Sequence, residues 1–202
     1  GYLEKYVILG QSEALWSFGF NVSNIGTKVS YDGGNTNQFL PTKLSLGTGL
    51  LYPLDDYNQI ALYVDLSKYL VPTAPIQTGS TAEEIEEYNQ KYEEYNNMSP
   101  ITGIFKSFSD SPNGFKGELE EIMASIGLEY NYNEQFFVRG GYYYENKYQG
   151  NRQYFSVGAG FRMSVFQLDA AYLISTVQSN PLDQTLRFSL SFDMDGIRNL
   201  FR

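Results

Sequence analysis

Apolar and polar residues alternate along most of this chain, the period-two pattern that is typical of β-strands with two different faces. In the first such segment, Trp16, Phe18 and Phe20 fall on one face, and Ser17 and Gly19 fall on the other. The pattern recurs in about eight segments and predicts an all-β protein. The predicted strands are residues 14–23, 43–52, 58–67, 121–131, 135–146, 153–164, 165–176 and 184–194.

The length of these segments separates two kinds of β-protein. Strands of soluble sheets have about 5–6 residues, whereas a tilted strand that crosses a bilayer needs about 9–11. The predicted strands match the second length, and their polar faces carry mainly Gly and Ser, which suits a barrel interior. The sequence therefore predicts a transmembrane antiparallel up-and-down β-barrel of a bacterial outer membrane. A soluble β-sandwich with its apolar face inward is the alternative.

The connections between the predicted strands alternate strictly in length. Outer-membrane barrels have short periplasmic turns and longer extracellular loops, so this alternation supports the barrel. With the C-terminus in the periplasm, every long connection is expected to be extracellular. The short connections are near 53–57, 132–134 and 164–166, and the longer ones near 24–42, 68–120, 147–152 and 177–183. We expect a single domain over residues 1–202.

Glycine is frequent on the polar faces, and this bears on the size of the barrel. An interior lined by so little side-chain volume would leave voids in a barrel of only about eight strands. We therefore expect the chain to be the C-terminal part of a larger barrel, with residues 1–12 belonging to an earlier loop or strand. The glycines are Gly19, Gly47, Gly49, Gly127, Gly141, Gly158 and Gly160.

The segment 68–120 breaks the alternation and predicts helices inserted between two strands. Residues 81–97 begin with Thr81 and Glu84 at the spacing of a capping box, and a second amphipathic turn follows Pro100. The segment is either a lid packed on the barrel mouth or a docking surface for a protein partner, in which exposed aromatic residues are the anchors. The candidate partner-binding residues are Tyr88, Tyr92, Tyr95, Ile101, Ile104, Phe105 and Phe108.

Composition narrows the possible functions. Aromatic residues make up 16% of the chain, with 18 Tyr and 14 Phe against one Trp, and Tyr suits a membrane–water boundary. The net charge of −9 argues against a nucleic-acid partner. The chain has no His and no Cys, which excludes His-dependent catalysis and thiolate nucleophiles within it. We expect no enzymatic activity and no cofactor.

Charged residues on the polar faces predict ion pairs in the barrel lumen. Arg162 and Asp169 are expected to lie opposite each other across the turn at 165–166, and Arg139 one pair diagonal from Glu129. Arg187 shares the inner face of the last strand with Asp193. These pairs compensate charge inside the barrel, or they form a polar pathway or ligand-anchoring ladder.

Two short acidic motifs, Asp55-Asp56 and Asp193-Met-Asp195, lack the carbonyl and glycine spacing of a calcium loop. They predict no metal site.

Four stretches resemble the PorV family, the outer-membrane shuttle component of the type IX secretion system of Bacteroidetes. The stretches are Phe20–Tyr31 (FNVSNIGTKVSY), Phe39–Gly47 (FLPTKLSLG), Tyr63–Thr73 (YVDLSKYLVPT) and Asn180–Phe192 (NPLDQTLRFSLSF). The first and last are fairly specific, whereas the middle two are shared more loosely with FadL-like transporters of hydrophobic compounds. Within the last stretch, Thr185–Phe192 looks like the aromatic-rich closing strand that outer-membrane assembly machinery recognises.

The resemblance implies a barrel of about fourteen strands and a non-enzymatic role. Family members collect secreted cargo by its C-terminal domain at the translocon barrel protein and carry it to a cell-surface attachment complex. The implied partners are the translocon, cargo C-terminal domains, attachment proteins and outer-membrane lipid or lipopolysaccharide. The alternative is a FadL-like transporter of hydrophobic small molecules. Family members have also been linked to lipid A deacylation, but a His-dependent hydrolase cannot reside in these residues.

Overall fold

A computed structural model describes residues 1–30, 37–177 and 182–200. Tyr31, Asn180 and Pro181, which belong to two of the stretches quoted above, lie outside the described residues. The strands are β1 Tyr2–Leu9, β2 Ser12–Ser23, β3 Lys43–Pro53, β4 Asn58–Tyr69, β5 Met123–Tyr132, β6 Phe136–Tyr144, β7 Tyr154–Met163, β8 Phe166–Ser175 and β9 Leu186–Phe192. The helices are α1 Ala82–Asn97, α2 Pro100–Lys106, α3 Gly114–Glu120 and α4 Met194–Leu200.

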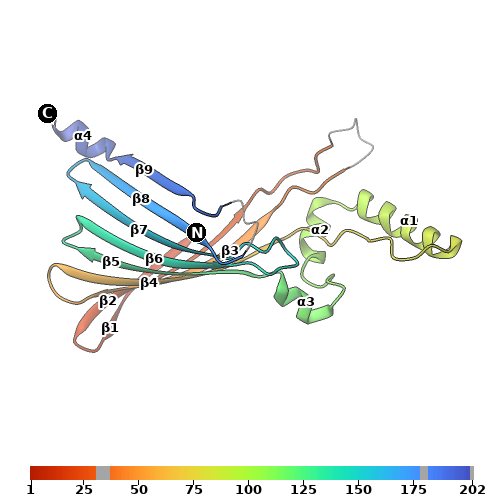
Figure 1. The fold of residues 1–202 in the computed structure, drawn as a ribbon, viewed down its shortest axis with the longest axis horizontal. Coiled ribbons are helices and arrows are strands. Elements are labelled where there is room, and N and C mark those ends of the chain that lie inside the picture. Colours follow the sequence, from red (N-terminus) through yellow and green to blue (C-terminus); the bar gives the residue numbers. More distant parts are fainter. Residues whose placement is uncertain (31–36, 178–181, 201–202) are drawn as a thin grey trace. The chain divides into compact units, whose positions relative to one another are not determined.

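The strands form one antiparallel sheet in which each strand pairs with its neighbours in the chain, from β1 to β9 (Figure 1). This confirms the predicted all-β, up-and-down fold. Within the described residues β1 and β9 are the two edges of the sheet, so the sheet is open and not closed on itself.

The sheet has nine strands in the part of the chain described, one more than the eight predicted. The additional strand is β1, which pairs with β2 from Tyr2 opposite Gly19 to Leu9 opposite Ser12. Its sequence places Glu4 on one face and Lys5 on the other, so neither face is uniformly apolar. Alternation therefore could not reveal this strand.

Short and long connections alternate, as predicted. The short ones are residues 10–11, 54–57, 133–135 and 164–165, and Figure 1 shows these turns together at one end of the sheet. The longer ones are residues 24–42, 70–122, 145–153 and 176–185. Several tight turns use left-handed backbone, as at Gly10 with φ 64° and at Asn133 and Glu134 with φ 54° each.

The apolar face of the sheet is exposed, which is the reverse of the arrangement in a soluble protein. On β7 the apolar Phe155 and Val157 are 52% and 51% exposed, whereas Gly160 on the polar face is buried. On β9, Phe188 is 69% exposed. A soluble sandwich would bury this apolar face, so its exposure favours a sheet whose apolar face meets another apolar medium.

None of the helices in the described part of the chain is long and apolar enough to span a membrane.

The chain forms two compact units. The first comprises Gly1–Phe20, Leu46–Leu66 and Met123–Arg202, and therefore most of the sheet. The second comprises Asn21–Ser45 and Ser67–Ile122, and therefore includes the segment 68–120 predicted as a helical loop.

Candidate functional site

Helix α1 in the second unit begins with the predicted capping box. The Thr81 side chain accepts from the Glu84 backbone N–H at 3.3 Å, and the Glu84 carboxylate accepts from the Thr81 backbone N–H at 3.0 Å. These two bonds satisfy donors that a helix N-terminus otherwise leaves unpaired. The predicted helix at 81–97 is thus confirmed.

The tyrosine stripe of α1 is half-buried within the second unit. The rings of Tyr88 and Tyr92 lie 5.9 Å apart, and Tyr95 packs edge-on against Phe39 at 5.2 Å between ring centroids. Burial, followed by the charges of Tyr92 and Asp110, raises the pKa of Tyr95. Tyr95 therefore contributes to the internal packing of this unit, and its role as a partner anchor stays a prediction.

A distant lysine completes the C-terminus of α1, whose last turn contains no basic residue. The Lys28 ammonium donates to the carbonyls of Tyr95 and Asn96 at 2.8 and 2.9 Å and lies 4.1 Å from the Phe39 ring centroid. A cation at this end of a helix interacts favourably with its dipole and unpaired carbonyls. Burial lowers the pKa of Lys28. Its role was not predicted, because Lys28 is far from α1 in the sequence.

Helix α2 turns its apolar stripe outward. Ile101, Phe105 and Phe108 are 68%, 73% and 50% exposed, and Ile104 is half-buried. The helix packs instead through small residues, the buried Gly103 and Ser107. A Cβ on Gly103 would lie 2.7 Å from the Phe39 ring, so only a glycine allows this close approach. The stripe is therefore not buried by the packing of α2, and its role in a lid or a docking surface stays a prediction.

Helix α3 was not predicted, and an ion-paired cluster holds it to the end of β4. The Lys68 ammonium donates to Glu118 at 2.9 Å and also to Glu121, and the three side chains are only 10–15% exposed. Glu118 also accepts from the Ser111 backbone N–H at 2.9 Å. Burial acts to raise the pKa of Glu118, but the bonds from Lys68 and Ser111 outweigh it, so this pKa lies below its ordinary value.

A hollow of about 700 Å³ lies within the second unit, between α1 and the extended segment 72–78. Its lining includes Pro75 and Ile76 from that segment, Tyr88 and Lys91 from α1, and Asp110. The hollow is therefore partly apolar and partly charged, as a surface that accepts a peptide would be.

On the polar face of the first unit, Arg139 links three strands. It lies directly opposite Glu129, rather than diagonal to it as predicted, and donates to this carboxylate at 2.5 Å. It also pairs with Asp169, two strands away on β8. A Cβ on Gly160 of the intervening strand would lie 3.0 Å from Arg139 Nη1, so the missing side chain of Gly160 leaves room for this ion pair.

The predicted pairing of Arg162 with Asp169 is wrong. Gln167 lies opposite Arg162 and accepts from it at 2.9 Å, whereas Asp169 lies opposite Gly160. Arg187 lies opposite Ala171. Asp193 follows β9 instead of sharing its face, and its carboxylate accepts from the Asp195 backbone N–H at the start of α4. A lumenal role of these residues stays a prediction.

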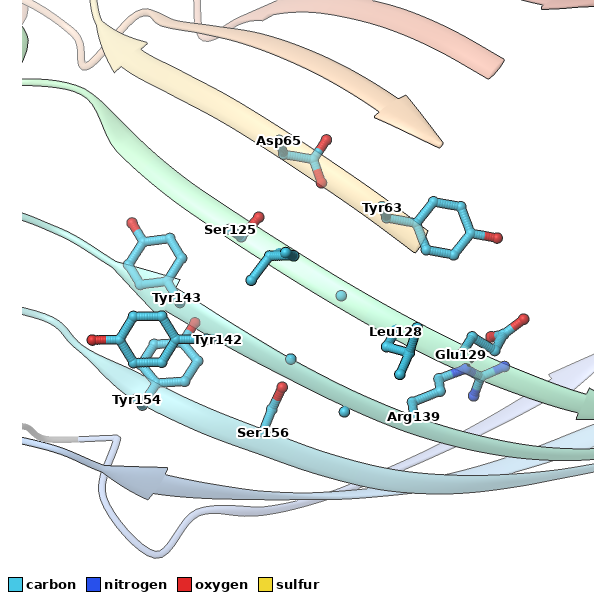
Figure 2. Close-up of a pocket in the computed structure, with 14 residues that line it drawn as sticks. Tyr63, Asp65, Ser125, Leu128, Glu129, Arg139, Tyr142, Tyr143, Tyr154 and Ser156 are labelled. Atoms are coloured by element: carbon cyan, nitrogen blue, oxygen red, sulfur yellow. Dashed lines mark hydrogen bonds and ion pairs between the residues drawn. The ribbon is translucent and has the colours of Figure 1, made fainter. Parts of the chain in front are cut away.

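Figure 2 shows a hollow of about 480 Å³ on the polar face of β4 to β7. Its lining includes Tyr63 and Asp65 on β4, Glu129 on β5, Arg139 on β6 and Tyr154 on β7.

The prediction that glycines on the polar face leave voids holds only at some positions. A Cβ on Gly49 would lie 2.6 Å from the Tyr63 ring, whereas one on Gly127 would meet nothing within 4 Å.

The Asp55 carboxylate stabilises the turn that contains it. The carboxylate accepts from the backbone N–H groups of Tyr57 and Asn58, both at 2.8 Å, and from the Asn58 side chain. These bonds, that from Tyr57 first, lower the pKa of Asp55.

Residues 2–76 match the family model described as Type IX secretion system protein PorV. This match confirms the resemblance to the PorV family for the three quoted stretches that lie within residues 2–76, and it includes β1 to β4. No curated protein matches the chain. The match covers less than half of the chain and shows that residues 2–76 are similar to a type IX secretion system protein.

Proposed function

We propose that this chain, whose residues 2–76 match the PorV family model, is a non-enzymatic outer-membrane component of type IX secretion. In this proposal it binds secreted cargo by its C-terminal domain at the translocon and carries it to the cell-surface attachment complex. The family match is the observation that carries the proposal. The exposed apolar face of the sheet supports a place in the outer membrane, with the long connections extracellular.

Exposed apolar side chains in the second unit support the proposal that this chain binds a protein partner. Ile101 and Phe105 of α2, and Phe108 just after it, are exposed to solvent, although α2 packs through Gly103 and its C-cap Ser107. Exposed aromatic and aliphatic side chains of this kind often become anchors when a partner buries them. We therefore assign the docking surface to α2, and we assign Tyr95 to the packing of α1.

The runner-up, a FadL-like transporter of hydrophobic molecules, would use the hollow on the polar face. Its lining includes Asp65, Glu129 and Arg139, whose charges suit an apolar ligand poorly. Lipid or fatty acid that co-purifies with the protein and is displaced by substitutions in this hollow would favour the transporter.

The test of the proposal is affinity purification of the protein from outer membranes, followed by mass spectrometry. We expect a large translocon barrel protein, or secreted proteins that share a C-terminal domain. The triple variant Ile101→Ser, Phe105→Ser, Phe108→Ser should lose them. The matched control is Tyr148→Ser, which removes a 70% exposed aromatic from the connection 145–153. Equal recovery with both variants would remove α2 from the proposal, and recovery of neither class of protein with the unaltered chain would remove the shuttle.

A further inference from the structure

An extended segment of the second unit forms one wall of the hollow beside α1. Residues 72–78 run alongside α1 before the chain turns back into this helix (Figure 1). Pro72 and Pro75 fix their own φ at about −65° and keep the residues before them out of the helical region, so the segment is extended before anything binds to it. The Asp110 carboxylate accepts from the Thr73 backbone N–H at 2.8 Å and so fixes the segment to the rest of the unit.

The main chain of this wall is unpaired. Within the described part of the chain, the backbone N–H and carbonyl groups of residues 74–78 make no hydrogen bond to another protein group. Ala74, Gln77 and Thr78 are exposed, and Ile76 is 75% exposed. An extended segment in this condition can pair with a second extended chain, which then gains main-chain hydrogen bonds.

The opposite wall is one continuous face of α1. The residues of α1 that line the hollow fall at three- and four-residue spacings from Glu84 to the C-cap Met98, as on one side of a helix. This helix face and the extended segment each span about 20 Å. The hollow between them has a volume of about 700 Å³, within the range of roughly 300–1,000 Å³ that is typical of ligand pockets. Its dimensions fit an extended segment of about six residues.

The charges around the hollow favour a basic occupant. Four carboxylates and two ammonium groups line it, and α1 as a whole contains six glutamates and one lysine. This lysine, Lys91, is paired with Glu87 at 2.6 Å. The Glu94 carboxylate makes no hydrogen bond or ion pair within the described residues, so it is available to a cation from outside the chain. Ile76 and Tyr88 give the same hollow an apolar surface.

We propose that the hollow binds an extended protein segment rich in basic residues, which adds its main chain to residues 74–78 and places a Lys or Arg side chain against Glu94. The inference deepens the proposed function and rests on it, because it states which chemistry the second unit recognises in a cargo or translocon protein. Main-chain pairing gives affinity for an extended segment, whereas the acidic wall selects its side chains. The prolines lower the entropic cost of this pairing, because the segment is already extended.

Peptide binding to the purified chain in neutral detergent tests this site. The probe is a fluorescein-labelled hexapeptide of alternating Val and Lys, and its binding is measured by fluorescence anisotropy. One comparison peptide has Glu in place of Lys. Another is the Val–Lys peptide with every second backbone nitrogen methylated, which removes donors and keeps the charge. The variant Glu94→Lys reverses a charge in the hollow, and its matched control, Glu93→Lys, makes the same change at an exposed neighbour on α1 that does not line the hollow.

We expect saturable binding of the Val–Lys peptide and binding of the Val–Glu peptide that is weaker by at least about tenfold. Glu94→Lys should weaken binding of the Val–Lys peptide roughly tenfold, and Glu93→Lys by less than about threefold, because attraction becomes repulsion only inside the hollow. Methylation should weaken binding by more than about tenfold, since several main-chain hydrogen bonds are lost together.

Equal weakening by Glu94→Lys and Glu93→Lys overturns the hollow as the site. Equal binding of the Lys and Glu peptides overturns the selection by charge, and unaltered binding of the methylated peptide overturns the main-chain pairing. The assay contains no other secretion component. Absence of peptide binding, together with recovery of translocon or cargo in the purification described above, therefore overturns this site alone. Peptide binding without that recovery supports the site and overturns the shuttle.

Discussion

Substitution of Lys68 by Met tests the ion-paired cluster that holds α3 to β4. The ammonium is shared by Glu118 and Glu121, and all three side chains are 10–15% exposed. Removal of one member of a buried ion pair costs about 3–5 kcal/mol, because the remaining charge is left buried without a partner. Two carboxylates that retain some contact with solvent reduce this cost, so we expect about 2–3 kcal/mol.

The cost should appear as local opening of α3 and not as unfolding of the sheet. At about 1.4 kcal/mol per factor of ten, it corresponds to roughly a 30- to 150-fold loss of amide protection. Hydrogen–deuterium exchange of peptides covering residues 111–122 measures this loss. Peptides from β7 and β8 should be unaffected, because the cluster makes no contribution to their pairing.

The matched control is Lys91→Met, which makes the same substitution in an exposed pair. Lys91 and Glu87 are 2.6 Å apart, with side chains 60% and 66% exposed, and exposed helix pairs contribute only about 0.3–0.5 kcal/mol. Addition of Glu118→Gln and Glu121→Gln to Lys68→Met should restore most of the protection, since no charge is then left unpaired. Equal protection of α3 in Lys68→Met and Lys91→Met would refute the reasoning.

Three further predictions use the same structure. The pKa of Glu118 in the folded protein lies below its ordinary value of 4.5, so Glu118 stabilises α3 above pH 4.5 and this stabilisation is lost as the pH falls through the lower folded pKa. Hydrogen–deuterium exchange of α3, measured as a function of pH, should accelerate in that acidic range. The acceleration should be smaller in Glu118→Gln. Gly160→Ala should lower the urea midpoint by the equivalent of about 1–3 kcal/mol through overpacking, whereas Gly127→Ala, with open space around it, should be neutral or stabilising. Glu134→Gly should stabilise the β5–β6 turn by about 0.5–1 kcal/mol in the same assay, because position 134 has φ 54°, and Gln135→Gly should not.

The predictions that held rest on local chemistry. Period-two alternation depends only on the pleat of a strand, and it found β2 to β9. The capping box depends on residues three apart, and it found the start of α1 at Thr81. The alternation failed for β1, where Glu4 and Lys5 occupy opposite faces. It also gave no sign of α3, which is too short to show a helical repeat.

The wrong partner predicted for Arg162 was an error in the register between β7 and β8. The turn between β7 and β8 has two residues, Ser164 and Val165, and places Gln167 opposite Arg162. A turn centred one residue later would have placed Asp169 there, because moving the centre of an antiparallel turn by one residue moves every partner by two. The sequence alone does not determine the turn centre to within one residue.

By itself the sequence determined the two-faced strands, their order of short and long connections, and the resemblance that the family match confirmed. Only the tertiary structure decided that Arg139 reaches Asp169 across Gly160, that Lys28 completes the end of α1, and that α2 packs through Gly103. Each of these contacts joins residues far apart in the chain or selects between two faces of one helix. Periodicity shows that a helix or strand has two faces, but only the docking of elements shows what each face meets.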